Sequence, residues 1–364
     1  MAVFALNAAI FLVGAAIVVA TVLSAVKTFV LPRGAPVAIS RIVFTSIRWV
    51  FNQVTRPSRP YDVRDRVMAM YTPIVLVTLP VVWLTLVGIG FTAMFWALGV
   101  RPLTEAIATS GASVSTVGFD RPHLFPAILL SFVEAALGLG LVALLISYLP
   151  TIYAAYSRRE VVVGQLEPLA GTPPSPKVML LQHHYILGLD RLDRVWTRWQ
   201  EWFADVEESH TSIAALVFFR SPHPNRSWVT AAGCVLDTAA IDLACLDSPA
   251  SPEAQLCIRA GFVALRRIAD FFRIAYDPDP RPDAPISVRR EEFDRLWDEL
   301  KREKVRLKKD REQAWRDYAG WRVNYDQVIR ALATLTMAPA APWTSDRALP
   351  FRFTPLAQQA AEND

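Results

Sequence analysis

Residues 113–120 read Ser-Val-Ser-Thr-Val-Gly-Phe-Asp and lie between two long, mostly apolar stretches. The preceding stretch, 67–100, has no charged residue, and the following stretch, 122–157, contains one carboxylate, Glu134. Backbone carbonyls of an extended Thr-Val-Gly-Phe segment, together with the Thr116 hydroxyl, are oxygen ligands of the kind that replace the hydration shell of a potassium ion. The segment therefore predicts a site that coordinates a cation through main-chain oxygens.

The surroundings of this segment predict a re-entrant loop. The stretch Arg101–Arg121 is too short and too polar to cross a hydrocarbon layer of about 30 Å. Irregular backbone is tolerated at that depth only where it is buried in protein or lines a water-filled cavity. Pro102 should begin a short helix that ends near Ala112, with its negative dipole end toward the cation. Gly118 allows a positive φ, so that successive carbonyls can point the same way.

Composition divides the chain into two parts. Hydrophobic residues make up 53% of the sequence, but 20% charged residues are too many for a wholly embedded protein. Residues 1–164 hold the apolar runs, while 165–364 resemble a soluble domain large enough to bury its own core. The first part carries 12 basic and 6 acidic side chains, a net charge of +6, whereas the whole chain has +4, so the excess positive charge belongs to a membrane surface. A nucleic-acid partner is not expected.

Three cysteines without CxxC spacing predict core residues in a reducing compartment, namely Cys234, Cys245 and Cys257.

Three segments are long enough to span a lipid bilayer: Met1 to Leu31, about Val67 to Val100, and about Leu124 to Tyr156. The first lacks the basic start and short apolar core of a cleaved signal peptide, so an uncleaved anchor is expected. Eight basic side chains lie from Lys27 to Arg66, and Arg158 and Arg159 follow the third span. The positive-inside rule then predicts a multi-pass protein of the plasma (cell) membrane, with its N-terminus outside and its C-terminal domain in the cytoplasm.

Residues 39–54 predict an amphipathic helix in the plane of the interface. Four polar residues form one stripe that should turn its arginines toward anionic headgroups: Arg41, Thr45, Arg48 and Asn52. Such a helix could be a collar that transmits movement to the pore helices or a plain anchor.

The predicted divisions follow from these features. They are an anchor helix at 1–36, an interfacial helix and basic loop at 37–66, a membrane core at 67–164, a linker at 165–177, a cytoplasmic all-helical domain at 178–338 and a Pro-rich, partly disordered tail at 339–364.

Thr116, Val117, Gly118 and Phe119 match the first four positions of the pattern Thr-Val-Gly-Tyr/Phe-Gly-Asp. Residues 67–160 therefore resemble the tetrameric pore-loop potassium channels of the bacterial two-transmembrane type. The order of outer helix, pore helix, filter and glycine-bearing inner helix also matches. The resemblance implies a membrane α-helical fold with a pore-loop transmembrane domain, an all-α cytoplasmic domain beside it, and a homotetramer. It also implies permeant potassium ions and no other cofactor.

One position departs from the pattern of that family. The second filter glycine is missing, because Asp120 either replaces it or follows a one-residue deletion. Aspartate tolerates a left-handed backbone better than most residues, so the filter could keep its form. Four copies of Asp120 would form a carboxylate ring that concentrates cations at the outer mouth. Selectivity for potassium over sodium is left open by this departure.

Further residues are candidates for supporting or opening the pore. Ser115 and Glu134 are candidates for filter support, and Glu134 could instead face the pore and hold cations. Contact with the pore helix is favoured, because Glu134 lies about 14 residues after Asp120 and hence near the level of the filter. Gly138 and Gly140 could be gating hinges or points of close helix packing. Pro150 should kink the inner helix near its cytoplasmic end.

The C-terminal part has a helical pattern throughout. Helices are expected at about 211–220, 227–245, 252–275, 288–303 and 311–337, with starts at Ser251 and Asp310. A further apolar stripe with helical spacing contains Tyr185, Leu189, Leu192, Trp196, Trp199, Phe203 and Val206. There is no dinucleotide-binding motif, no metal-ligand spacing and no nucleophile–base arrangement, so an enzyme is not expected. The ligand or partner of this domain is not specified by the sequence.

The sequence thus predicts a subunit of a homotetrameric cation channel, with potassium as the expected ion and a cytoplasmic helical domain for regulation or assembly. A non-conducting or weakly selective receptor or scaffold derived from a channel is the principal alternative. The loop could also be a polar extracellular hairpin between two anchors. A transporter of the Trk/Ktr type would need four pore loops where this chain has one, and a membrane-anchored enzyme would need an active site in the helical domain.

Overall fold

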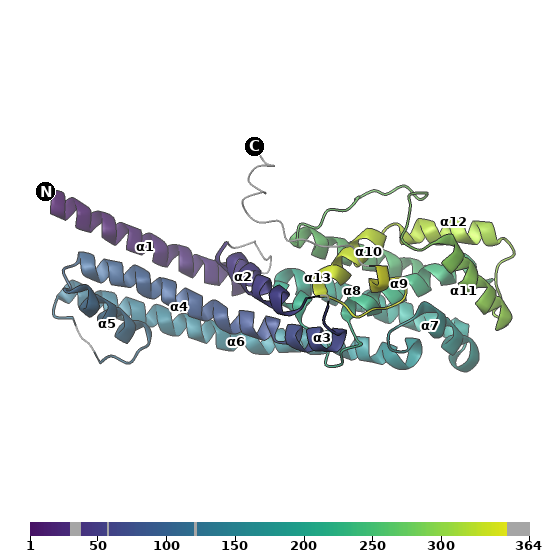
Figure 1. Cartoon of the computed structure of the whole chain (residues 1–364), viewed down its shortest axis with the longest axis horizontal. Helices are drawn as coiled ribbons and strands as arrows, with labels where there is room; N and C mark the ends of the chain where they lie inside the picture. The colour runs from purple at the N-terminus through teal and green to yellow at the C-terminus, as the bar shows by residue number, and fades with distance from the viewer. Residues whose placement is uncertain (30–37, 57, 120–121, 348–364) are drawn as a thin grey trace. The chain divides into compact units, whose positions relative to one another are not determined.

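The computed structural model describes residues 1–29, 38–56, 58–119 and 122–347 (Figure 1). Within these ranges the chain is helical and has no strand, which confirms the helical fold class. The chain divides into two compact units. Unit 1 comprises Met1–Arg56 and Val67–Ala154, and unit 2 comprises Pro57–Arg66 and Ala155–Asp364.

Four helices are long and apolar enough to cross a membrane. Three of them correspond to the predicted spans: α1 (Ala2–Phe29), α4 (Tyr71–Ala97) together with the short helix α3 (Tyr61–Ala69) before it, and α6 (Phe125–Ala170). The fourth, α9 (Trp228–Cys245), has 94% of its residues buried inside the protein. That burial identifies α9 as the core helix of unit 2, in line with the helix expected at 227–245.

Helix α6 continues further than the sequence suggested. The predicted end near Tyr156 and the predicted linker at 165–177 are wrong, because the helix is unbroken through Pro150 and runs to Ala170. The physical reason is a second apolar face: Val162, Val163 and Leu166 are buried in unit 2. The connection that remains is short, since α7 (Pro176–Gln182) begins almost at once.

In unit 1, α1 and α4 pack together where both have a glycine. A Cβ atom on Gly14 would lie 2.5 Å from the carbonyl oxygen of Gly90, and one on Gly90 would lie 2.7 Å from Cγ2 of Val18. Only glycine at both positions allows this approach. Small residues allow the backbones of membrane helices to come this close.

The amphipathic helix α2 (Ala38–Val54) is present as predicted, but one residue of its predicted polar stripe is buried. Arg48 is buried, with its guanidinium 5.4 Å from the ring centre of Tyr71, which itself donates a hydrogen bond of 3.1 Å to the Phe44 carbonyl. Arg48 therefore does not belong to a polar stripe that faces headgroups. The exposed residues of α2 include Trp49 and Val50 as well as the polar Ser46, Asn52 and Gln53.

Unit 2 is a helical domain around α9. Besides α7 and the end of α6, it contains α8 (Leu192–Ser212), α10 (Pro252–Phe271), α11 (Arg290–Arg302), α12 (Arg311–Arg322) and α13 (Asp326–Thr336). Ser251 and Asp310 cap α10 and α12 through bonds to the backbone, as expected. The three cysteines are buried and unpaired, which agrees with their predicted core role.

Three sequence predictions in unit 2 need correction. The stripe expected from Tyr185 is buried only from Leu192 onward, because Gly188 at φ +93° ends a π-helical turn and α8 begins after it. The helix expected at 211–220 is a 3₁₀ turn, η3 (Ala214–Phe218). The helix expected at 311–337 is interrupted between α12 and α13.

The basic side chains after the third span are also placed differently. Arg159, which the topology prediction counted as flanking the membrane, is completely buried in unit 2. Arg158 remains partly exposed and pairs with Asp205 at 3.0 Å.

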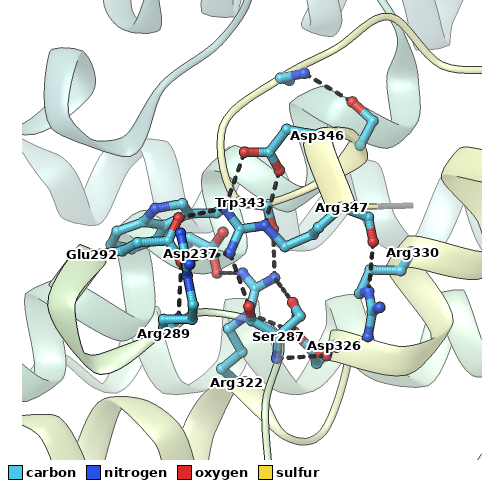
Figure 2. Close-up of polar contacts among 12 residues, drawn as sticks. Asp237, Ser287, Arg289, Glu292, Arg322, Asp326, Arg330, Trp343, Asp346 and Arg347 are labelled. Carbon is cyan, nitrogen blue, oxygen red and sulfur yellow. Dashed lines mark hydrogen bonds and ion pairs between the residues drawn. The ribbon is translucent and has the colours of Figure 1, made fainter. Parts of the chain in front are cut away.

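A buried polar network surrounds Arg322 (Figure 2). Arg322 pairs with Asp237, which also accepts a hydrogen bond of 2.9 Å from Tyr325, and it binds Asp326 at 2.8 Å. Both Arg322 and Asp237 are completely buried, so each charge depends on the other for compensation.

The same network holds the segment that follows α13. Arg322 donates to the Trp343 carbonyl, and Arg347 binds both carboxylate oxygens of Glu292 at 2.9 and 3.0 Å (Figure 2). Thr344 packs against Gly233, since a Cβ atom on Gly233 would lie 2.3 Å from the Thr344 hydroxyl oxygen. The tail predicted at 339–364 is therefore packed on the domain as far as Arg347, and the rest of it lies outside the described residues.

The contact between Glu292 and Arg347 predicts a dependence of stability on pH. Hydrogen bonds from Arg347 lower the pKa of Glu292 from 4.5 to about 2. A carboxyl with a lowered pKa stabilises the fold above its unfolded pKa, and this stabilisation is lost as the pH falls from about 4.5 to 2. We expect a loss of about 1–2 kcal/mol, which allows for solvent screening.

Thermal unfolding of the purified protein between pH 6 and pH 3 measures this effect. Glu292→Gln should remove that part of the pH dependence, whereas Glu291→Gln, at the exposed neighbouring position, should retain it. An unchanged pH profile in Glu292→Gln would contradict the assignment.

Candidate ion-coordinating site

The short helix predicted from Pro102 to near Ala112 is present as α5 (Leu103–Val114), directly after Pro102. At its C-terminal end the chain turns: the Ser115 hydroxyl donates to the Gly111 carbonyl at 2.5 Å, and the Gly118 amide donates to the Ala112 carbonyl at 3.1 Å. This turn returns the chain across the end of the helix and includes Thr116 to Gly118. The prediction of an extended Thr-Val-Gly-Phe segment is therefore wrong for Thr116 to Gly118, because the amides of Thr116 and Gly118 bind carbonyls in the last turn of α5.

The backbone of that segment has two left-handed residues. Gly118 has φ +68°, which confirms the expected positive φ, and Thr116 has φ +57°. A Cβ atom on Gly118 would meet no atom within 4 Å, so glycine is favoured here by conformation and not by space. Residues 115–119 are all exposed on the single chain, with Val117 66% and Phe119 73% exposed. Asp120 lies outside the described residues.

Helix α5 is held by a polar contact that joins three helices. The Ser110 hydroxyl lies 2.6 Å from Oε1 of Glu134 on α6 and 3.0 Å from the Gly88 carbonyl on α4. Glu134 is completely buried. Two positions were considered for this acid. The structure shows the contact that was favoured, between Glu134 and the short helix before the loop.

The two hinge candidates differ in their surroundings. A Cβ atom on Gly138 would lie 2.4 Å from the Val114 carbonyl oxygen, at the last turn of α5. Gly138 thus lets α6 approach the base of the loop, and close packing is what the structure shows for it. A Cβ atom on Gly140 would meet nothing within 4 Å.

The chemistry available to this site is that of neutral oxygen ligands. Among the described residues, no group of three or more His, Cys, Asp or Glu side chains could hold a metal ion. The carbonyl groups of residues 116–119 and the Thr116 hydroxyl suit a weakly bound monovalent cation. One such loop cannot surround an ion by itself.

Ser110 was not identified from the sequence, although a signal was available. A buried carboxyl in an apolar helix requires a hydrogen-bond donor, and Ser110 is one of the polar residues on the facing helix. Gly88 contributes only its carbonyl, so no residue pattern could have revealed it.

No protein-family model, curated protein sequence or solved structure matches this chain.

The contact between α6 and α5 predicts different effects at two neighbouring glycines. Gly138→Ala should lower the stability of the detergent-solubilised protein by about 1–3 kcal/mol, because the new methyl group overlaps the Val114 carbonyl. Gly140→Ala should leave stability nearly unchanged, since its methyl group meets no atom. Thermal unfolding of both variants checks this, and equal stabilities would contradict the close approach of α5 and α6.

Proposed function

We propose that this chain is one subunit of a homotetrameric channel that conducts cations, with potassium as the principal ion. The observation that carries the proposal is the turn at Ser115–Phe119, where a filter-like sequence leaves the C-terminal end of α5 with an uncovered backbone. The contact between Ser110 and Glu134 holds this turn from behind.

The exposed surface of α6 supports assembly from several copies. Only 17% of the most apolar 18-residue stretch of α6 is buried in the single chain. Large apolar side chains remain exposed at Phe132, Leu139 and Ile146. Lipid can cover one side of such a helix. In the proposed tetramer, another side packs against a neighbouring copy or lines the pore below the filter.

Conduction would be passive and would involve no covalent chemistry. A cation loses its water to the carbonyls of residues 116–119, and the Thr116 hydroxyl supplies the innermost ligands. The C-terminal end of α5 carries a partial negative charge that favours a cation nearby. Four copies of Asp120 would concentrate cations at the outer entrance. In this proposal the N-terminus is outside a plasma membrane and unit 2 is in the cytoplasm.

Cation flux into liposomes that contain the purified protein tests the proposal. Potassium flux should exceed sodium flux and should be lost in Gly118→Ala, because alanine at φ +68° costs about 1–2 kcal/mol and disturbs the filter backbone. Caesium serves as a third ion, and Val13→Ala, at an exposed position on α1, serves as a matched control.

The outcomes separate the candidate functions. Equal flux of all three cations would retain the pore and remove the claim of selectivity. No flux above empty liposomes from folded, tetrameric protein would favour a non-conducting receptor or scaffold.

A further inference from the structure

The 214–220 segment, which consists of η3, Phe219 and Arg220, has an unusual position in unit 2. It connects α8 to the loop before α9, and Leu216 and Val217 are buried. Its carbonyl groups accept hydrogen bonds from α6, while its last side chain binds α3. The segment therefore contacts the continuations of two membrane helices within one domain.

On the α6 side, the contacts come from Arg159 and Tyr156. Arg159 donates to the Leu216 carbonyl at 2.8 Å and to the Phe219 carbonyl at 2.7 Å, and Tyr156 donates to the carbonyl of residue 220 at 3.1 Å. Arg159 also lies 3.1 Å from Nε2 of His210.

His210 completes this attachment as a neutral ring. Burial, together with the nearby Arg159 charge, keeps the pKa of His210 well below its usual value. A neutral imidazole can accept the hydrogen bond of the guanidinium. Arg159 also pairs with Glu160 of α6 at 2.7 Å, so its completely buried guanidinium has acceptors from α6, His210 and the 214–220 segment.

On the α3 side, the contacts come from Arg220. Its guanidinium pairs with Asp65 and donates to the Tyr61 hydroxyl at 2.6 Å. It also donates to the carbonyls of Thr336 and Met337, at 2.6 and 2.9 Å. Arg220 and Asp65 are only 10% and 13% exposed, so the pair is largely shielded from water and costly to separate.

Both sides of this attachment are continuous with long apolar helices. Helix α3 passes through Met70 directly into α4, and α6 contains both the buried start of this attachment and the residues behind the candidate filter. We propose that the 214–220 segment is a coupling element, through which a change in unit 2 reaches the ends of α4 and α6 together. This inference rests on the proposed function only for its effect on conduction.

Amide hydrogen exchange of the full-length protein in detergent tests the coupling without any need for conduction. Asp65→Asn and Tyr61→Phe alter only the α3 side of the attachment. Each should raise exchange about tenfold or more in 61–69 and also in 155–162 of α6, as expected from the loss of a hydrogen bond to a charged group. Tyr156→Phe should produce the reciprocal change in 61–69.

Arg158→Ala is the matched control, since it removes an exposed ion pair on the same turn of α6 without touching the 214–220 segment. It should leave exchange in 61–69 unchanged. Increased exchange confined to the side that carries the substitution would overturn the coupling, whatever the protein conducts.

Conduction provides the second readout. Asp65→Asn should change the open probability severalfold and leave the ratio of potassium to sodium flux as in the wild type. An unchanged open probability, or an altered ion ratio alone, would overturn the proposed coupling. Absence of flux in the wild type would reject the channel proposal, and the exchange experiment would still decide whether α3 and α6 are coupled.

Discussion

The structure of unit 1 depends on how a short helix with a polar end is held among apolar ones. Backbone groups at membrane depth must find partners inside the protein. The last turn of α5 meets this requirement through the Ser115 hydroxyl and the Gly118 amide, which donate to the Gly111 and Ala112 carbonyls. The helix itself is held by Ser110, which contacts Glu134 and the Gly88 carbonyl, and by Gly138, which allows the close approach of Val114. Without these contacts the turn after α5 would have no fixed position, and a coordination site made of carbonyls requires a fixed position.

The remaining helices extend this support. Glycines on α1 and α4 allow the two backbones to pack closely. This packing supports α4, whose Gly88 carbonyl contacts Ser110. In unit 2, buried arginines repeatedly bind main-chain carbonyls: Arg159 binds the 214–220 segment, and Arg322 binds the segment after α13. Each joins stretches that are far apart in the sequence. Buried arginines thus hold distant segments of unit 2 together.

The sequence predicted well those features that depend on local patterns. The three long apolar helices, the short helix after Pro102, the positive φ of Gly118 and the caps at Ser251 and Asp310 follow from hydropathy, proline and glycine geometry and side-chain capping. These signals act within a few residues, so a sequence displays them directly.

The features that were missed depend on tertiary contacts. Arg48 and Arg159 carry charges that suggest a membrane surface, yet both are buried by aromatic or carbonyl partners from distant segments. The extension of α6 depends on Val162 and Leu166 finding a core to enter. Similarly, only the approach of Val114 distinguishes Gly138 from Gly140. None of these partners can be read from the residue itself.

The central claim is that carbonyls of several chains together coordinate a cation. Determination of the structure of the membrane-inserted protein in rubidium, with anomalous scattering to locate the ion, tests it most directly. The account predicts four chains around one axis, with rubidium between the carbonyls of residues 116–119. A single chain or another symmetry, or rubidium absent from the axis at saturating concentration, would contradict it.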